Sequence, residues 1–118
     1  MKALILEDDA KRIEFFKQCI GHHELSITDN SKKAIEYLKN NTYYYIFLDN
    51  DLGEGNGEGL DVAEFLYKNP KNPNNKSITI IHSWNTSAAS LMRNKLPHAI
   101  LAPFKTKFFS SLLLTFKK

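Results

Sequence analysis

The sequence predicts one α/β domain built around a parallel β-sheet, and three observations carry that prediction. Five short apolar segments typical of strands alternate with five segments in which apolar residues recur at helical spacing. Two of the strand segments, residues 3–6 and 43–48, are continuously apolar, as expected of strands buried on both faces. Carboxylates follow each of these two segments directly, as Glu7-Asp8-Asp9 and as Asp49 and Asp51.

The composition supports a single globular unit spanning residues 1–118. Hydrophobic residues make up 42% of the chain and charged residues 25%, which is ordinary for a domain with a packed core. The net charge of +3 comes from lysines spread along the chain, so a nucleic-acid surface is not indicated. The single cysteine, Cys19, cannot form an internal disulfide, and there is no apolar stretch of 18 residues. We therefore expect a cytoplasmic protein without a membrane partner.

The first half of the chain is predicted to contain three strands and two helices. Residues 2–6 form the first strand, residues 10–20 form a helix, and Gly21 follows as a C-cap glycine. Residues 24–28 alternate polar and apolar, which is typical of a strand near a sheet edge. The next helix can be capped by Asp29, Asn30 or Ser31 and presents Ala34, Ile35 and Leu38. Residues 43–48 form the central strand.

The second half continues the same alternation. Residues 50–58 hold three of the five glycines and are predicted to form a loop, followed by a helix over 60–67. A polar connection with two prolines covers residues 69–75. Strands are then expected at 78–81 and 99–102, and helices at 86–96 and from about 105 to 116.

The acidic residues after the two buried strands predict a divalent-metal site. Ligands of open α/β sheets bind outside the carboxyl ends of the strands, so these acids converge if the two strands are neighbours. Like charges held close together are costly unless a cation neutralises them, and Mg²⁺ or Mn²⁺ suits oxygen ligands. The candidate metal residues are Glu7, Asp8, Asp49 and Asp51. Helix capping by residues 7–9 and turn formation by residues 49–51 are the structural alternatives.

The order and length of the elements resemble the CheY-like receiver domain of bacterial response regulators over nearly the whole chain. Residues 4–9, Leu-Ile-Leu-Glu-Asp-Asp, are similar to the family's first strand and acid pair, and residues 46–52 to the strand that ends in the phospho-accepting aspartate, here Asp49. Ser83 and the Pro103-Phe104 pair also fall at family positions. The resemblance implies a flavodoxin-like (βα)5 fold, with sheet order 2-1-3-4-5 and helices on both faces.

Two departures separate this chain from ordinary receivers. Ala102 stands where the family has a lysine that pairs with the phosphoryl oxygens, and Gly53 replaces the usual proline before a longer, glycine-rich loop. The segments Leu-Asp-Asn-Asp-Leu-Gly and Ile-His-Ser-Trp-Asn resemble a divergent branch, often associated with phages or mobile elements, that is proposed to process cyclic phosphates.

The resemblance implies a role for each site residue. Asp8 and Asp49 would be the side-chain metal ligands, Glu7 would hold a metal-bound water, and Asp51 would add its backbone carbonyl. Asp49 would act as nucleophile or ligand, Ser83 would donate to a phosphate oxygen, and Asn85 would add a donor or orient a water. His82 is either a buried structural residue or a catalytic one; it or a lysine from elsewhere could replace the charge missing at Ala102. Trp84 is interpreted as a packing residue.

These observations leave several functions open, and whether the chain is an enzyme is one of the open points. The first is metal-dependent chemistry on, or binding of, a phosphate-bearing ligand, with cyclic phosphates as candidates. The second is a single-domain response regulator in two-component signalling, phosphorylated on Asp49 by a histidine kinase or phosphotransfer partner and signalling by protein contact. The third is a pseudo-receiver interaction module, and a distant fourth is a Toprim-like nuclease.

Overall fold

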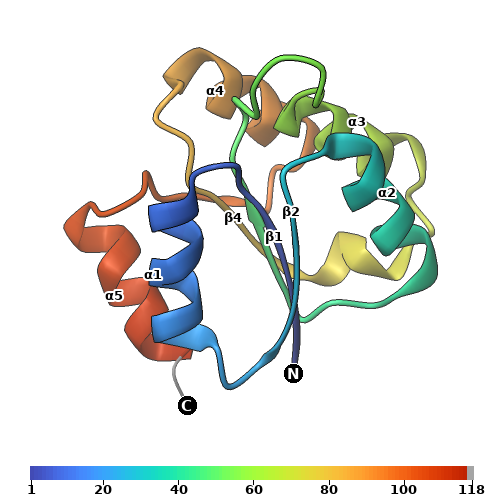
Figure 1. Ribbon diagram of the computed structural model, residues 1–118. Helices are drawn as coiled ribbons and strands as arrows, with labels where there is room; N and C mark the ends of the chain where they lie inside the picture. The colour runs from blue at the N-terminus through green and yellow to red at the C-terminus, as the bar shows by residue number, and fades with distance from the viewer. Residues whose placement is uncertain (117–118) are drawn as a thin grey trace.

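The computed structural model describes residues 1–116 and contains one five-stranded parallel sheet in the order β2-β1-β3-β4-β5 (Figure 1). The strands are β1 (Lys2–Leu6), β2 (Glu24–Thr28), β3 (Tyr45–Leu48), β4 (Ile78–Ile81) and β5 (Ile100–Leu101). This order confirms the predicted flavodoxin-like receiver fold. It places β1 beside β3, and β3 beside β4, so the carboxyl ends of these three strands are adjacent.

Helices cover both faces of the sheet. The helices are α1 (Ala10–Ile20), α2 (Ser31–Asn40), α3 (Gly59–Lys68), α4 (Thr86–Lys95) and α5 (Lys107–Phe116), with a short 3-10 helix at Pro73–Lys76. Helices α1 and α5 lie side by side on one face, and α2, α3 and α4 cover the other (Figure 1). Asp9, Asn30 and Asn85 cap α1, α2 and α4 through their side chains. Helix capping by Asp9 is thus confirmed.

Side-chain alternation along the strands divides the core into two layers. Ile5 of β1, Phe47 of β3 and Ile80 of β4 pack with Phe16 of α1 and Phe109 of α5. The intervening residues, such as Leu4, Leu6 and Leu48, pack under α2, α3 and α4. The same alternation extends to the residues directly after each strand, so it determines which face of the sheet their side chains occupy.

The structure corrects the predicted boundaries at two strands. The strand predicted over residues 43–48 begins at Tyr45, because the Tyr43 amide donates to Asn74 Oδ1 at 2.7 Å instead of joining the sheet. Asn74 is completely buried in the 3-10 helix that forms within the predicted polar connection. The strand predicted over 99–102 shortens to two residues.

Gly21 does hold the C-cap position of α1, but not in the way that the sequence suggested. Its backbone has φ −64°, which is right-handed, so the left-handed freedom of glycine is not what ends the helix. In the described part of the chain, no helix is long and apolar enough to cross a membrane.

Candidate functional site

Glu7, Asp49 and His82 occupy one row at the carboxyl ends of three neighbouring strands. The last paired residues of these strands are Leu6, Leu48 and Ile81, and each of the three follows one of them. Backbone hydrogen bonds carry the pairing one residue further, from the Asp49 amide to the Leu6 carbonyl at 3.1 Å and from the His82 amide to the Leu48 carbonyl at 3.0 Å. Alternation turns all three side chains toward the face covered by α1 and α5.

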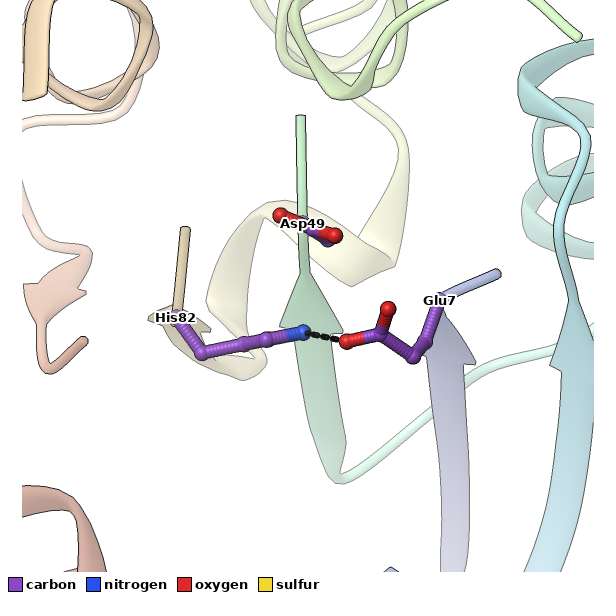
Figure 2. A group of neighbouring side chains, drawn as sticks. All are labelled: Glu7, Asp49 and His82. Carbon is purple, nitrogen blue, oxygen red and sulfur yellow. Dashed lines mark hydrogen bonds and ion pairs between the residues drawn. The ribbon is translucent and has the colours of Figure 1, made fainter. Parts of the chain in front are cut away.

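Glu7 and His82 form a buried pair at the base of the site. Figure 2 shows the two side chains pointing toward one another, with His82 Nε2 lying 2.9 Å from Glu7 Oε1, and neither residue is exposed to solvent. Burial would raise the pKa of Glu7, but the hydrogen bond and charge of His82, helped by the Asp9 amide and Arg12, lower it to about 2. Glu7 is therefore a carboxylate, and His82 donates to it.

The other oxygen of Glu7 is also occupied. Glu7 Oε2 accepts hydrogen bonds from the amides of Asp8 and Asp9 at 3.0 and 3.1 Å. The ring of His82 lies against Phe16, with centroids 5.3 Å apart. The three hydrogen bonds from His82, Asp8 and Asp9 use most of the acceptor capacity of Glu7, since a carboxylate has about four lone-pair sites. This carboxylate fixes the loop after β1 and the position of His82.

Asp49 is buried beside the Glu7–His82 pair, and fewer hydrogen bonds stabilise its negative charge. It is 5% exposed, its Oδ1 accepts the Asn50 amide at 2.9 Å, and its Oδ2 lies 3.8 Å from a terminal guanidinium nitrogen of Arg12. Burial raises the pKa of Asp49 to about 6; the charge of His82, the Asn50 amide and the charge of Arg12 lower it, and the charge of Glu7 raises it, but burial is the largest effect. A cation placed at Asp49 would remove this penalty.

A cleft of about 510 Å³ opens over Asp49 and gathers most of the residues predicted for the site. Its lining includes the carboxylates of Asp8, Asp49 and Asp51, together with Ser83 and Asn85. The central strand β3 ends at Leu48, and Asp51 forms an isolated bridge to Glu58 in the loop that follows. Asp51 nevertheless borders the same cleft as Asp49.

Ser83 and Asn85 sit at the start of α4 with defined hydrogen bonds. Ser83 is 2% exposed, and its Oγ accepts the Asn85 amide at 3.0 Å, which leaves the hydroxyl hydrogen available to a group in the cleft. The side chain of Asn85 caps α4 through the Ala88 amide and reaches Asp51 Oδ1 at 3.3 Å. Trp84 is 58% exposed on the cleft, so its interpretation as a packing residue was wrong.

The cleft offers donors of the type that suits a hard divalent cation, but among the described residues Asp8 and Asp51 do not form with Asp49 a group whose ligand atoms all lie within 4.8 Å of one another. Asp8, Asp49 and Asp51 offer carboxylate oxygens at one opening, which is the ligand type that Mg²⁺ and Mn²⁺ prefer. Glu7, Asp49 and His82 do bring ligand atoms within 4.8 Å of one another, but the first and third are bonded to each other. The metal role of all four predicted acids stays a prediction, with Glu7 placed beneath the cleft and the other three lining it.

Sequence reasoning missed Arg12. One of its terminal nitrogens lies 3.8 Å from both Glu7 Oε1 and Asp49 Oδ2, and its guanidinium sits 5.1 Å from the ring centre of Phe104. A positive charge to replace the one missing at Ala102 was expected from His82 or a lysine. The available signal was the position of Arg12 in the first turn of α1, directly after the acidic loop.

Comparisons with known proteins bear on the family and the fold. A family model described as the cyclic-phosphate processing receiver domain matches residues 3–98. A search of curated protein sequences found no match.

Solved receiver domains share the fold at low sequence identity. The signal receiver domain of a putative LuxO repressor protein from Vibrio parahaemolyticus has a TM-score of 0.72 at 18% identity, covering 98% of this chain and 91% of its own. A CheY-like receiver domain from Methanospirillum hungatei has a TM-score of 0.70 at 20% identity, with 98% and 90% covered. The response regulator TrrA from Thermotoga maritima, solved in complex with Mg²⁺ and beryllofluoride, has a TM-score of 0.68 at 18% identity, with 98% and 99% covered.

Proposed function

The chain belongs to the family of cyclic-phosphate processing receiver domains, and from that premise we propose that it binds Mg²⁺ or Mn²⁺ and uses the metal site to bind or process a phosphate-bearing ligand. Cyclic phosphates are the first candidates, because the family description names them. The observation that carries the proposal is the convergence of Asp8, Asp49 and Asp51 with Ser83 on one cleft at the carboxyl ends of β1, β3 and β4.

Each residue has a role that its surroundings support. Asp8 and Asp49 hold the metal, and Asp51 joins them through its carboxylate or its backbone carbonyl. The bound metal would neutralise charge on the ligand's phosphate oxygens. The Ser83 hydroxyl donates to a phosphate oxygen, and Asn85 orients the ligand or a water from the start of α4. Glu7 and His82 keep the three strand ends in register beneath the metal. In this arrangement His82 is a structural residue.

A second candidate function is phosphorylation of Asp49 in a single-domain response regulator. The observation that favours it is the free side of Asp49, whose Oδ2 faces Arg12 at 3.8 Å without a hydrogen bond. TrrA was solved with Mg²⁺ and beryllofluoride, a mimic of the acyl phosphate. A histidine kinase or phosphotransfer protein would be the phosphodonor, and the location would be cytoplasmic. Ala102 weighs against this candidate because it removes the lysine with which the resemblance to phospho-accepting receivers would pair the phosphoryl oxygens.

Fluorescence of Trp84 tests the proposal directly. Trp84 is the only tryptophan of the chain and lines the cleft, so its emission should change when the cleft fills. We would titrate Mg²⁺ into the wild-type protein and the Asp49→Asn variant, add beryllofluoride, and then follow a panel of cyclic phosphodiesters by ³¹P NMR. We expect Mg²⁺ binding that needs Asp49, no response to beryllofluoride, and binding or ring opening of a cyclic phosphate.

The other outcomes identify the alternatives. A beryllofluoride response that needs both Mg²⁺ and Asp49 would establish the phospho-receiver. Absence of Mg²⁺ binding, confirmed by calorimetry, would leave a pseudo-receiver that acts only by protein contact. The Toprim-like alternative has no support from the family match.

A further inference from the structure

The guanidinium of Arg12 has a defined position, but its N–H groups donate no hydrogen bond within residues 1–116. Its two carboxylate neighbours stay 3.8 Å away, beyond hydrogen-bond distance. Glu7 does not need it, because the oxygens of Glu7 accept from His82 and from two backbone amides. Its guanidinium instead stacks over Phe104 with 30% of the side chain exposed.

Arg12 also faces the space in which a ligand would lie. Among the described residues that line the cleft over Asp49, it is the one cationic side chain, and Ser83 lies on the same lining. A second hollow of about 370 Å³, bordered by Arg12, Trp84 and Phe104, adjoins this cleft. A guanidinium fork whose N–H groups are free can donate two parallel hydrogen bonds to two oxygens of one phosphate group. Stacking on an aromatic ring holds the fork in one orientation before a ligand arrives.

Resting on the proposed function, we propose that Arg12 is the phosphate-contacting cation of this site and that it acts from α1 with Ser83 to bind the phosphate group of the ligand. The charge absent at Ala102 is thus supplied from α1 instead of from the end of β5. Ala102 is completely buried in the apolar layer under α1 and α5, so its own side chain does not reach the cleft.

Arg12→Gln separates this role from a purely structural one, because it should weaken phosphate binding without weakening Mg²⁺ binding. Removing a positive charge beside Asp49 relieves repulsion of Mg²⁺, so we expect Mg²⁺ affinity to stay equal or rise. Inorganic phosphate, titrated at saturating Mg²⁺ and followed by calorimetry, should bind at least tenfold more weakly. Arg12→Lys keeps the charge but loses the fork and should lie between the two.

Lys17→Gln is the matched control, since it removes one exposed positive charge from the same helix at a position that lines neither the cleft nor the adjoining hollow. It should change phosphate affinity by less than twofold. Equal phosphate affinity in Arg12→Gln and wild type, or no phosphate binding by a wild type that binds Mg²⁺, would overturn the assignment. Phosphate binding that needs Arg12 in a protein that binds no Mg²⁺ would instead refute the metal chemistry and leave the role of Arg12 standing.

Discussion

Replacing Asp49 by asparagine should stabilise the metal-free protein, and the gain should grow with pH. Burial raises the pKa of Asp49 from 3.8 to about 6, so ionising this group is harder in the folded than in the unfolded chain. The wild-type protein therefore loses stability as pH rises from the unfolded pKa through the folded one. At about 1.36 kcal/mol per pH unit, the loss is about 1 kcal/mol at pH 4.5 and about 3 kcal/mol at pH 8. Asparagine avoids this loss and can still accept the Asn50 amide.

Urea unfolding in the presence of a chelator, followed by circular dichroism at both pH values, measures this difference. We expect the Asp49→Asn midpoint to exceed the wild-type midpoint by about 1–2 M at pH 8 and by less than about 1 M at pH 4.5. Asp29→Asn, at an exposed carboxylate, is the control and should change stability by less than about 0.5 kcal/mol. Saturating Mg²⁺ should reverse the order at pH 8 by stabilising only the wild type. An equal gain at both pH values, or destabilisation at pH 8, would refute the reasoning.

Three further predictions concern the site and its support. The affinity for Mg²⁺ should fall by about tenfold per pH unit below about pH 6, because protons compete with the metal for Asp49. Equal Mg²⁺ affinity at pH 5 and pH 7, measured by calorimetry, would argue against Asp49 as a ligand. His82→Ala should destabilise the protein by about 3–5 kcal/mol, because it leaves the buried charge of Glu7 without its histidine partner. In a double-mutant cycle, adding Glu7→Gln should recover part of that loss, whereas additive losses would contradict the pairing. Gly59→Ala should destabilise the protein by more than about 2 kcal/mol, because a β-carbon at this position would overlap the carbonyl oxygen of Asp49. The control Gly55→Ala, at φ +80° with open space around it, should lower the free energy of unfolding by only about 1 kcal/mol. Similar losses for the two variants in urea unfolding would count against the close approach of Gly59 to Asp49.

The strand pattern could be predicted from the sequence because two physical signals agree along it. Continuous apolar residues mark β1 and β3 as buried on both faces, and period-two alternation assigns their side chains to the two core layers. The start of β3 could not be predicted in the same way. Tyr43 leaves the sheet for a hydrogen bond with Asn74, which lies 31 residues away, and nothing local in the sequence indicates that contact.

The site was predictable residue by residue but not in its pairings. Side-chain alternation along a strand implies that His82 and Ser83 point in opposite directions, and the structure places His82 against Phe16 of α1 while Ser83 lines the cleft. The pairing of His82 with Glu7 depends on the register between β1, β3 and β4, and a residue pattern does not contain that register. Arg12 was missed for a similar reason: its reach to Asp49 depends on how α1 packs against the sheet.

The charge balance of the cleft implies an order of binding. Four carboxylates and one guanidinium line it, which gives a net charge of −3 when all are ionised. A phosphate group entering this field alone would meet repulsion that the single charge of Arg12 cannot offset. A divalent cation reduces the net charge to about −1 and brings its own attraction for phosphate oxygens. The metal must therefore bind first and provide most of the electrostatic stabilisation, and Arg12 contributes the fixed direction of its donors, which decides where the phosphate group lies relative to Asp49 and Ser83.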